Sequence, residues 1–131
     1  MASYTMKRLE EIPDVLGDYP GEMRMCADQI ESEQVAFTWR RMPARTGGKG
    51  SYGHRHREQE EVYFVVDGTL QFKLEDEVVD VPAGTVVNIP PDVVRSVWNE
   101  GPEDAVVIIV SKKLPGGSAE DAEQVPDFWP E

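Results

Sequence analysis

The sequence predicts an all-β domain, and three observations support this. Short apolar runs recur along the 131 residues and are separated by Gly, Pro, Asn or Asp. Several runs alternate apolar and polar residues, which is the period of a strand with one buried face. No long stretch carries the i, i+3, i+4, i+7 spacing of an amphipathic helix. A chain of this length also falls below the ~150 residues used as a prior for one domain, so we expect a single domain.

The N-terminal part of the chain predicts one helical turn and one strand. Residues 9–15 are expected to form the turn. Val35, Phe37 and Trp39 alternate with Ala, Thr and Arg, which places these three on one face of a strand. We expect Trp39 to lie in the core. Glycines then punctuate residues 47–53.

The most strongly patterned strands of the chain are residues 62–66 and 70–74. Asp67-Gly68 lies between them and is a strong signal for a two-residue hairpin. Residues 105–110 are apolar at every position, which predicts a strand buried on both faces. The expected order is a β-meander with Greek-key options. Further strands are predicted at residues 78–81, 85–89 and 93–98.

The composition disfavours several classes of partner. The chain has 13 Lys and Arg against 25 Asp and Glu, a net charge of −12. Nucleic acids and anionic lipids bind Lys and Arg, so we expect neither as a partner. Cys26 is the single cysteine, which excludes an internal disulfide. No apolar run approaches the ~18 residues of a membrane span, and residues 1–13 lack the apolar region of a secretory signal. We therefore predict a cytoplasmic protein.

The two histidines of the chain are the first candidates for chemistry. His54 and His56 are one residue apart, so their imidazoles project to the same face of an extended segment. Glu60 and Glu61 follow before the next strand. Two imidazoles and a carboxylate suit a divalent metal such as Fe, Mn, Ni, Zn or Cu. Residues 54–61 are also dense in charge, so a solvated loop explains the same residues equally well.

The spacing around these residues resembles the first motif of the cupin superfamily, Gly-x5-His-x-His followed by a Glu and a Gly. The interval to Gly68 selects Glu61 rather than Glu60 as the matching acid. The second cupin motif, Gly-x5-Pro-x-Gly-x2-His-x3-Asn, is matched in part, with Arg95 in place of its His. The matching residues of the two motifs are Gly48, His54, His56, Glu61 and Gly68, then Gly84, Pro90 and Asn99, with Asp92 at the second Gly.

This resemblance covers residues 48–99 and implies a double-stranded β-helix, a jelly-roll barrel of antiparallel strands. The barrel would span residues 34–112. Residues 1–33 would form an N-terminal segment that packs on the barrel or exchanges a strand, and residues 113–131 a C-terminal tail. Small cupins commonly form dimers through such N-terminal strands, so the resemblance also implies a homodimer.

Arg95 leaves two hypotheses for the site, because a guanidinium stays protonated and has no lone pair for a metal. In the first, His54, His56 and Glu61 hold the metal with open positions, and Arg95 orients an anionic ligand. In the second, Arg95 forms a bidentate pair with Glu61, and the histidines become hydrogen-bonding groups of a metal-free pocket.

Tyr63 shares the inward face of its strand with Glu61, since the two are two residues apart. It joins Arg95, His54 and His56 as a candidate ligand-binding residue. We expect a pocket for a small anionic or polar molecule. The alternatives are a metal-dependent cupin enzyme of the dioxygenase, isomerase or decarboxylase type, and a barrel used for assembly only. No residue is assigned a catalytic role from the sequence, and whether the protein is an enzyme stays open.

Overall fold

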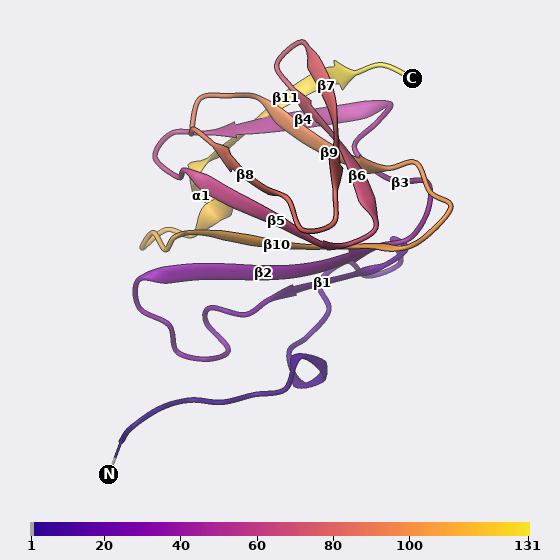
Figure 1. Ribbon diagram of the computed structural model, residues 1–131. Helices are drawn as coiled ribbons and strands as arrows, with labels where there is room; N and C mark the ends of the chain where they lie inside the picture. Colours follow the sequence, from indigo (N-terminus) through magenta and orange to yellow (C-terminus); the bar gives the residue numbers. More distant parts are fainter. Residues whose placement is uncertain (1) are drawn as a thin grey trace.

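The computed structural model describes residues 2–131 as two antiparallel sheets that enclose one core (Figure 1). This is the predicted jelly-roll barrel. The first sheet has the order β1 (Glu22–Met25), β2 (Val35–Met42), β10 (Ala105–Lys112), β5 (Glu61–Asp67) and β8 (Val86–Ile89). The second has the order β11 (Ala122–Trp129), β4 (Ser51–His56), β9 (Arg95–Asn99), β6 (Thr69–Leu74) and β7 (Glu77–Pro82), with β3 (Thr46–Gly47) paired to β9.

Apolar side chains from the inner faces of both sheets form the core. On β5, Tyr63 and Val65 are buried, whereas Phe64 and Val66 between and beyond them are exposed. This confirms the predicted alternation, which turns Glu61 and Tyr63 inward. The Tyr63 ring meets Phe72 of β6 edge to face, with ring centroids 5.3 Å apart, so the two sheets contact each other directly below the site.

The predicted hairpin at Asp67-Gly68 is wrong, and the strand order is not a simple meander but follows the Greek-key option. β5 pairs with β8 and β10, whereas β6 pairs with β7 and β9, so the chain passes between sheets at this point. Gly68 has a φ of +75°, and a Cβ there would lie 2.6 Å from the backbone oxygen of Asp104. Glycine is therefore needed where the chain turns tightly from one sheet to the other, and such a turn carries the same sequence signal as a hairpin. The two-residue hairpin joins β6 and β7 instead.

The faces of β2 are reversed relative to the prediction for Trp39. Met42 is 1% exposed within the core, and Arg40 shares its face. Trp39 lies on the outer face, in one row with Ile108 of β10 and Phe64 of β5, and is half-buried. The prediction that Trp39 lies in the core is therefore wrong. The predicted burial of residues 105–110 on both faces holds only in part, because Ala105 and Val107 are buried on the inner face, whereas Val106 and Ile108 on the outer face are half-buried.

Both terminal segments contact the barrel. A 3-10 turn, η1 (Leu9–Glu11), confirms the predicted helical turn, and β1 pairs with β2 of the same chain. A short helix, α1 (Ser118–Asp121), leads into β11, which pairs with β4. The domain boundaries and the homodimer stay predictions. Neither helical segment within residues 2–131 has the length and apolarity to cross a bilayer.

Candidate metal centre

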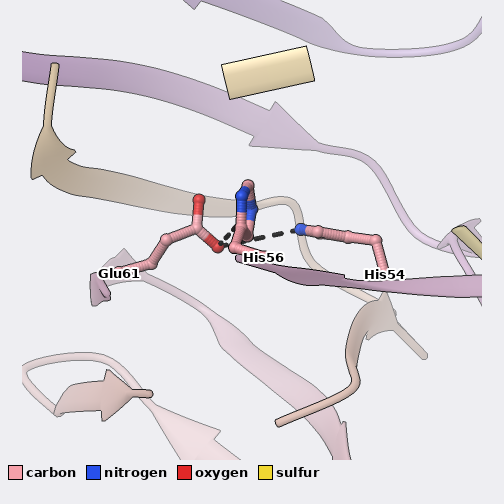
Figure 2. Close-up of side chains that lie close together, drawn as sticks. All are labelled: His54, His56 and Glu61. Carbon is pink, nitrogen blue, oxygen red and sulfur yellow. Dashed lines mark ion pairs between the residues drawn. The ribbon is translucent and has the colours of Figure 1, made fainter. Parts of the chain in front are cut away.

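His54, His56 and Glu61 converge inside the barrel (Figure 2). The two histidines lie one residue apart on β4 and share its inner face, and Glu61 begins β5 of the other sheet. His54 Nε2 lies 3.7 Å and His56 Nε2 lies 3.5 Å from Glu61 Oε1. Two ligands at ~2.1 Å from a tetrahedral metal are about 3.4 Å apart, so these three atoms fit around one ion.

Glu61 Oε1 is the atom at which the polar groups of the site meet. The Tyr63 hydroxyl donates a hydrogen bond to it at 2.9 Å. Burial raises the pKa of Glu61, but interactions with His54 and His56 lower it by more, so its pKa is well below the usual range. Burial and the charge of Glu61 raise the pKa of Tyr63 well above its ordinary value. The pair therefore consists of an ionised carboxylate and a phenol that keeps its proton.

Asp121 of α1 orients His56. Its carboxylate lies 3.1 Å from His56 Nδ1 and accepts hydrogen bonds from the backbone N–H groups of Glu58 and Gln59. Burial raises the pKa of Asp121, but the N–H groups of Gln59 and Glu58, together with His56, lower it further, so the net shift is downward. An ionised carboxylate only accepts hydrogen bonds, so His56 carries a proton on Nδ1.

This arrangement turns Nε2 of His56 toward Glu61, and this atom offers a lone pair when the ring is neutral, as metal binding requires. His56 Nε2 is buried and has no hydrogen-bond partner within residues 2–131. It faces Glu61 Oε1, which is itself an acceptor, across 3.5 Å. Two buried acceptors that face each other need a cation or a proton between them. The donor set therefore fits a divalent metal ion.

Arg95 does not form the bidentate pair with Glu61 that one hypothesis predicts. It is 0% exposed and lies opposite His54 in the pairing of β4 with β9. Only its Nε approaches Glu61 Oε1, at 3.7 Å. The guanidinium fork is turned away because its amino groups satisfy carbonyl oxygens at the end of β8. These acceptors are the carbonyls of Ile89 at 3.3 Å, Pro90 at 2.9 Å and Pro91 at 3.3 Å.

All five residues singled out from the sequence thus lie together in the barrel, and Asp121 was missed. No local pattern marks Asp121, because it is 65 residues from His56. The surface has two shallow depressions that are both lined by residues 114–115. Neither depression is lined by the two histidines or Glu61. The five predicted residues are His54, His56, Glu61, Tyr63 and Arg95.

Comparison with protein families gives one match. The family model described as "Cupin domain" matches residues 42–111, which is more than half of the chain. This range contains the five predicted residues but ends before Asp121. No curated protein matches the chain in sequence.

Solved structures with the same fold include three proteins with named activities. The polyketide cyclase RemF from Streptomyces resistomycificus has a TM-score of 0.67 and 16% identity, over 82% of this chain and 79% of that one. A proposed oxalate decarboxylase from Thermotoga maritima has a TM-score of 0.64 and 22% identity, over 82% and 97%. A proposed sugar phosphate isomerase from Acidithiobacillus ferrooxidans has a TM-score of 0.62 and 16% identity, over 82% of this chain and only 64% of that one. These similarities concern the fold.

Proposed function

Because this chain belongs to the cupin family, we propose that it binds a small molecule and holds one divalent metal ion on His54, His56 and Glu61. The supporting observation is the pair of buried acceptors, His56 Nε2 and Glu61 Oε1, that face each other across 3.5 Å. Two imidazoles and one carboxylate suit Fe, Mn, Ni, Zn or Cu. A metal held there leaves coordination positions open and supplies a Lewis acid for a bound ligand.

Each neighbouring residue has a defined part in this proposal. Asp121 holds the His56 ring so that Nε2 faces the interior. Tyr63 fixes the carboxylate of Glu61 through its hydroxyl proton. The guanidinium of Arg95, whose Nε lies 3.7 Å from Glu61 Oε1, would repel a dication held by this carboxylate and so reduce the metal affinity of the site. A metal-free protein in which His56 is doubly protonated between its two carboxylates is the competing interpretation.

The charges inside the barrel support a small anionic or polar ligand. The whole chain carries a net charge of −12. The described buried residues around the site carry two guanidiniums, Arg40 and Arg95, and two ionised carboxylates, Glu61 and Asp121, which balance each other. A divalent ion would therefore give the interior a net positive charge. The metal-loaded interior would attract anions although the protein as a whole repels them.

A metal-dependent enzyme is the second candidate function. The observation that favours it is the ligand set itself, because two histidines and one carboxylate leave positions open for substrate. The named activities of the structural neighbours, a cyclase, a decarboxylase and an isomerase, are compatible with this candidate. A binding protein returns its ligand unchanged, whereas an enzyme of the dioxygenase, isomerase or decarboxylase type converts it.

Metal loading of tag-free protein tests the proposal. Metal-free protein is incubated with Zn²⁺ or Co²⁺, desalted and analysed for bound metal by mass spectrometry. We expect close to one equivalent in the wild type. His56→Ala and Glu61→Gln should lose it, because each removes one of the three ligands. Glu60→Gln is the matched control, since Glu60 is the exposed neighbour of Glu61 and should keep full loading.

Circular dichroism establishes that each variant is folded before its metal content is compared. Glu61→Gln keeps the size of the side chain and so remains informative if His56→Ala fails to fold. No bound metal in the wild type after loading, or an equal loss in Glu60→Gln, contradicts the proposal and favours the metal-free interpretation.

A further inference from the structure

Arg40 extends from β2 into the barrel. It lies opposite Val107 of β10, which in turn lies opposite Val65 of β5. Both valines are at most 1% exposed, and Met42, two residues further along β2, is also 1% exposed. Because directly opposed residues and residues two apart share a face, the side chain of Arg40 begins on the apolar inner wall.

Arg40 has no partner for its charge in the described part of the chain. Its Nε is buried and makes no hydrogen bond, and the structure gives its guanidinium no ion pair within residues 2–131. Arg41, on the opposite face of the same strand, pairs with Glu22 at 3.1 Å and with Asp104 at 3.0 Å. Arg40 is half-buried, and of its nitrogens only Nε is both fully buried and without a partner, so its amino groups are accessible to a ligand.

The surroundings of Arg40 are phenolic rather than acidic. Burial lowers its pKa, and the ionisable groups that act on it are the hydroxyls of Tyr19, Tyr63 and Tyr52. Phenols are neutral at pH 7, so none of them balances the guanidinium. Tyr63 also donates to Glu61, which links the neighbourhood of Arg40 to the candidate metal centre.

The inner face of β4 shows where the barrel opens. The side chain of His56 is 3% exposed, that of His54 is 32% exposed, and Tyr52 is 50% exposed. Exposure therefore rises steadily from the metal centre toward the start of β4. Tyr19, which is 44% exposed and hydrogen-bonded to the backbone of Gly47, lies at the same end.

We propose that Arg40 anchors a carboxylate-binding subsite that opens toward the start of β4. The inference rests on the proposed function in one respect, namely that the ligand enters the barrel interior. The bound molecule carries its carboxylate on the guanidinium of Arg40. Arg95 is not available for this task, because its amino groups already donate to carbonyl oxygens.

A carboxylate fits this subsite better than a phosphate. A guanidinium matches a carboxylate as a planar, bidentate partner of equal and opposite charge. A phosphate ester carries up to two negative charges, whereas the guanidinium of Arg40 supplies one positive charge. The half-exposed rings of Tyr19 and Tyr52 also offer apolar surface for the body of an organic acid.

Calorimetric titration of metal-free and Zn²⁺-loaded protein tests this inference. The probes are acetate and benzoate as carboxylates, benzamide as the neutral analogue of benzoate, and inorganic phosphate. We expect a carboxylate to bind the wild type and to bind Arg40→Met about ten- to a hundredfold more weakly, which is the effect of losing a charged hydrogen-bonding partner. Arg41→Met is the matched control and should bind like the wild type.

This experiment can contradict the carboxylate subsite without contradicting the metal site, and the reverse. Arg40 is not a metal ligand, so Arg40→Met should keep the metal content of the wild type, and carboxylate binding to metal-free protein is measured independently of loading. No saturable binding of acetate or benzoate, equal affinity of the wild type and Arg40→Met, or equal binding of benzamide and benzoate overturns the subsite. Binding of phosphate without either carboxylate overturns the assigned ligand class.

Discussion

Two arginines face the interior of the barrel from opposite sheets, and their environments differ. Arg95 on β9 is fully buried, donates to three backbone carbonyls and lies beside the carboxylate of Glu61. Arg40 on β2 is half-buried and has neither a hydrogen bond on its Nε nor an ion pair. The Nε of each arginine lacks a hydrogen bond, but the amino groups of Arg95 donate to backbone carbonyls, whereas the structure shows no such bond for Arg40 within residues 2–131; this is why we propose Arg40 as the ligand-binding one. Arg95 and Arg40 therefore differ both in depth of burial and in the number of their hydrogen-bond partners.

The largest expected effect is a difference in stability between Arg95→Met and Arg40→Met. Removing Arg95 leaves the buried carboxylate of Glu61 without its cation, which should lower the free energy of unfolding by about 3–5 kcal/mol. Removing Arg40 eliminates a cation that has no partner, so stability should stay equal or rise by about 1 kcal/mol. Urea denaturation of the metal-free variants measures both values.

A bound carboxylate provides a second test of the difference between Arg40 and Arg95. A saturating carboxylate should stabilise the wild type, because it binds the folded state only, and should leave Arg40→Met unaffected. A stability loss in Arg40→Met as large as that in Arg95→Met would mean that the fold uses both guanidiniums in the same way.

Asp121→Asn should have the next largest effect, on metal affinity. The amide no longer holds the Nδ1 proton of His56 as a carboxylate does, and loss of such an orienting group typically weakens metal binding about 10- to 100-fold. Competition with a chromophoric chelator measures the Zn²⁺ affinity. Glu120→Gln is the matched control, because Glu120 is exposed and does not contact His56 through its side chain.

The pH dependence of stability provides a second measurement on Asp121. Its pKa in the folded protein lies below the ordinary value of about 3.8, so it stabilises the fold above that pH and loses this contribution as the pH falls. The free energy of unfolding of the wild type should therefore decrease more steeply below pH 4 than that of Asp121→Asn. Parallel curves would indicate that the carboxylate is not selectively stabilised in the folded state.

Tyr63→Phe should have the smallest effect. The substitution removes one hydrogen bond to an ionised carboxylate, which should cost about 1.5 kcal/mol in metal-free protein. The cost should be smaller after Zn²⁺ loading, because the ion then balances the charge of Glu61. Thermal denaturation of both forms measures the difference, and an equal cost in the two forms would argue that no ion contacts Glu61.

Local spacing was sufficient to predict the part of the site that is close in sequence. His54 and His56 share a face because they are one residue apart, and the interval to Gly68 separated Glu61 from Glu60. Asp121 was not predictable in this way, because only the pairing of β11 with β4 brings it to His56. Arg40 was obscured by Trp39, since an aromatic residue in an alternating run predicts an inward face, whereas here that face is the outer one.

The order of the strands was also not predictable from local residues. The Asp67-Gly68 pair fixes a change of chain direction, but the next strand can return in the same sheet or cross to the other one. That choice depends on pairing with β9 and β10, which lie far along the chain. Local residues therefore predicted the strands, and distant ones decided their order.

The position of Asp121 on α1 has a consequence for the order in which the protein is made. His56 leaves the ribosome well before the carboxylate that orients it, which follows 65 residues later. A nascent chain that has exposed both histidines and Glu61 still lacks the group that fixes the imidazole tautomer. High-affinity capture of an ion would therefore be delayed until the C-terminal strand is synthesised and docks.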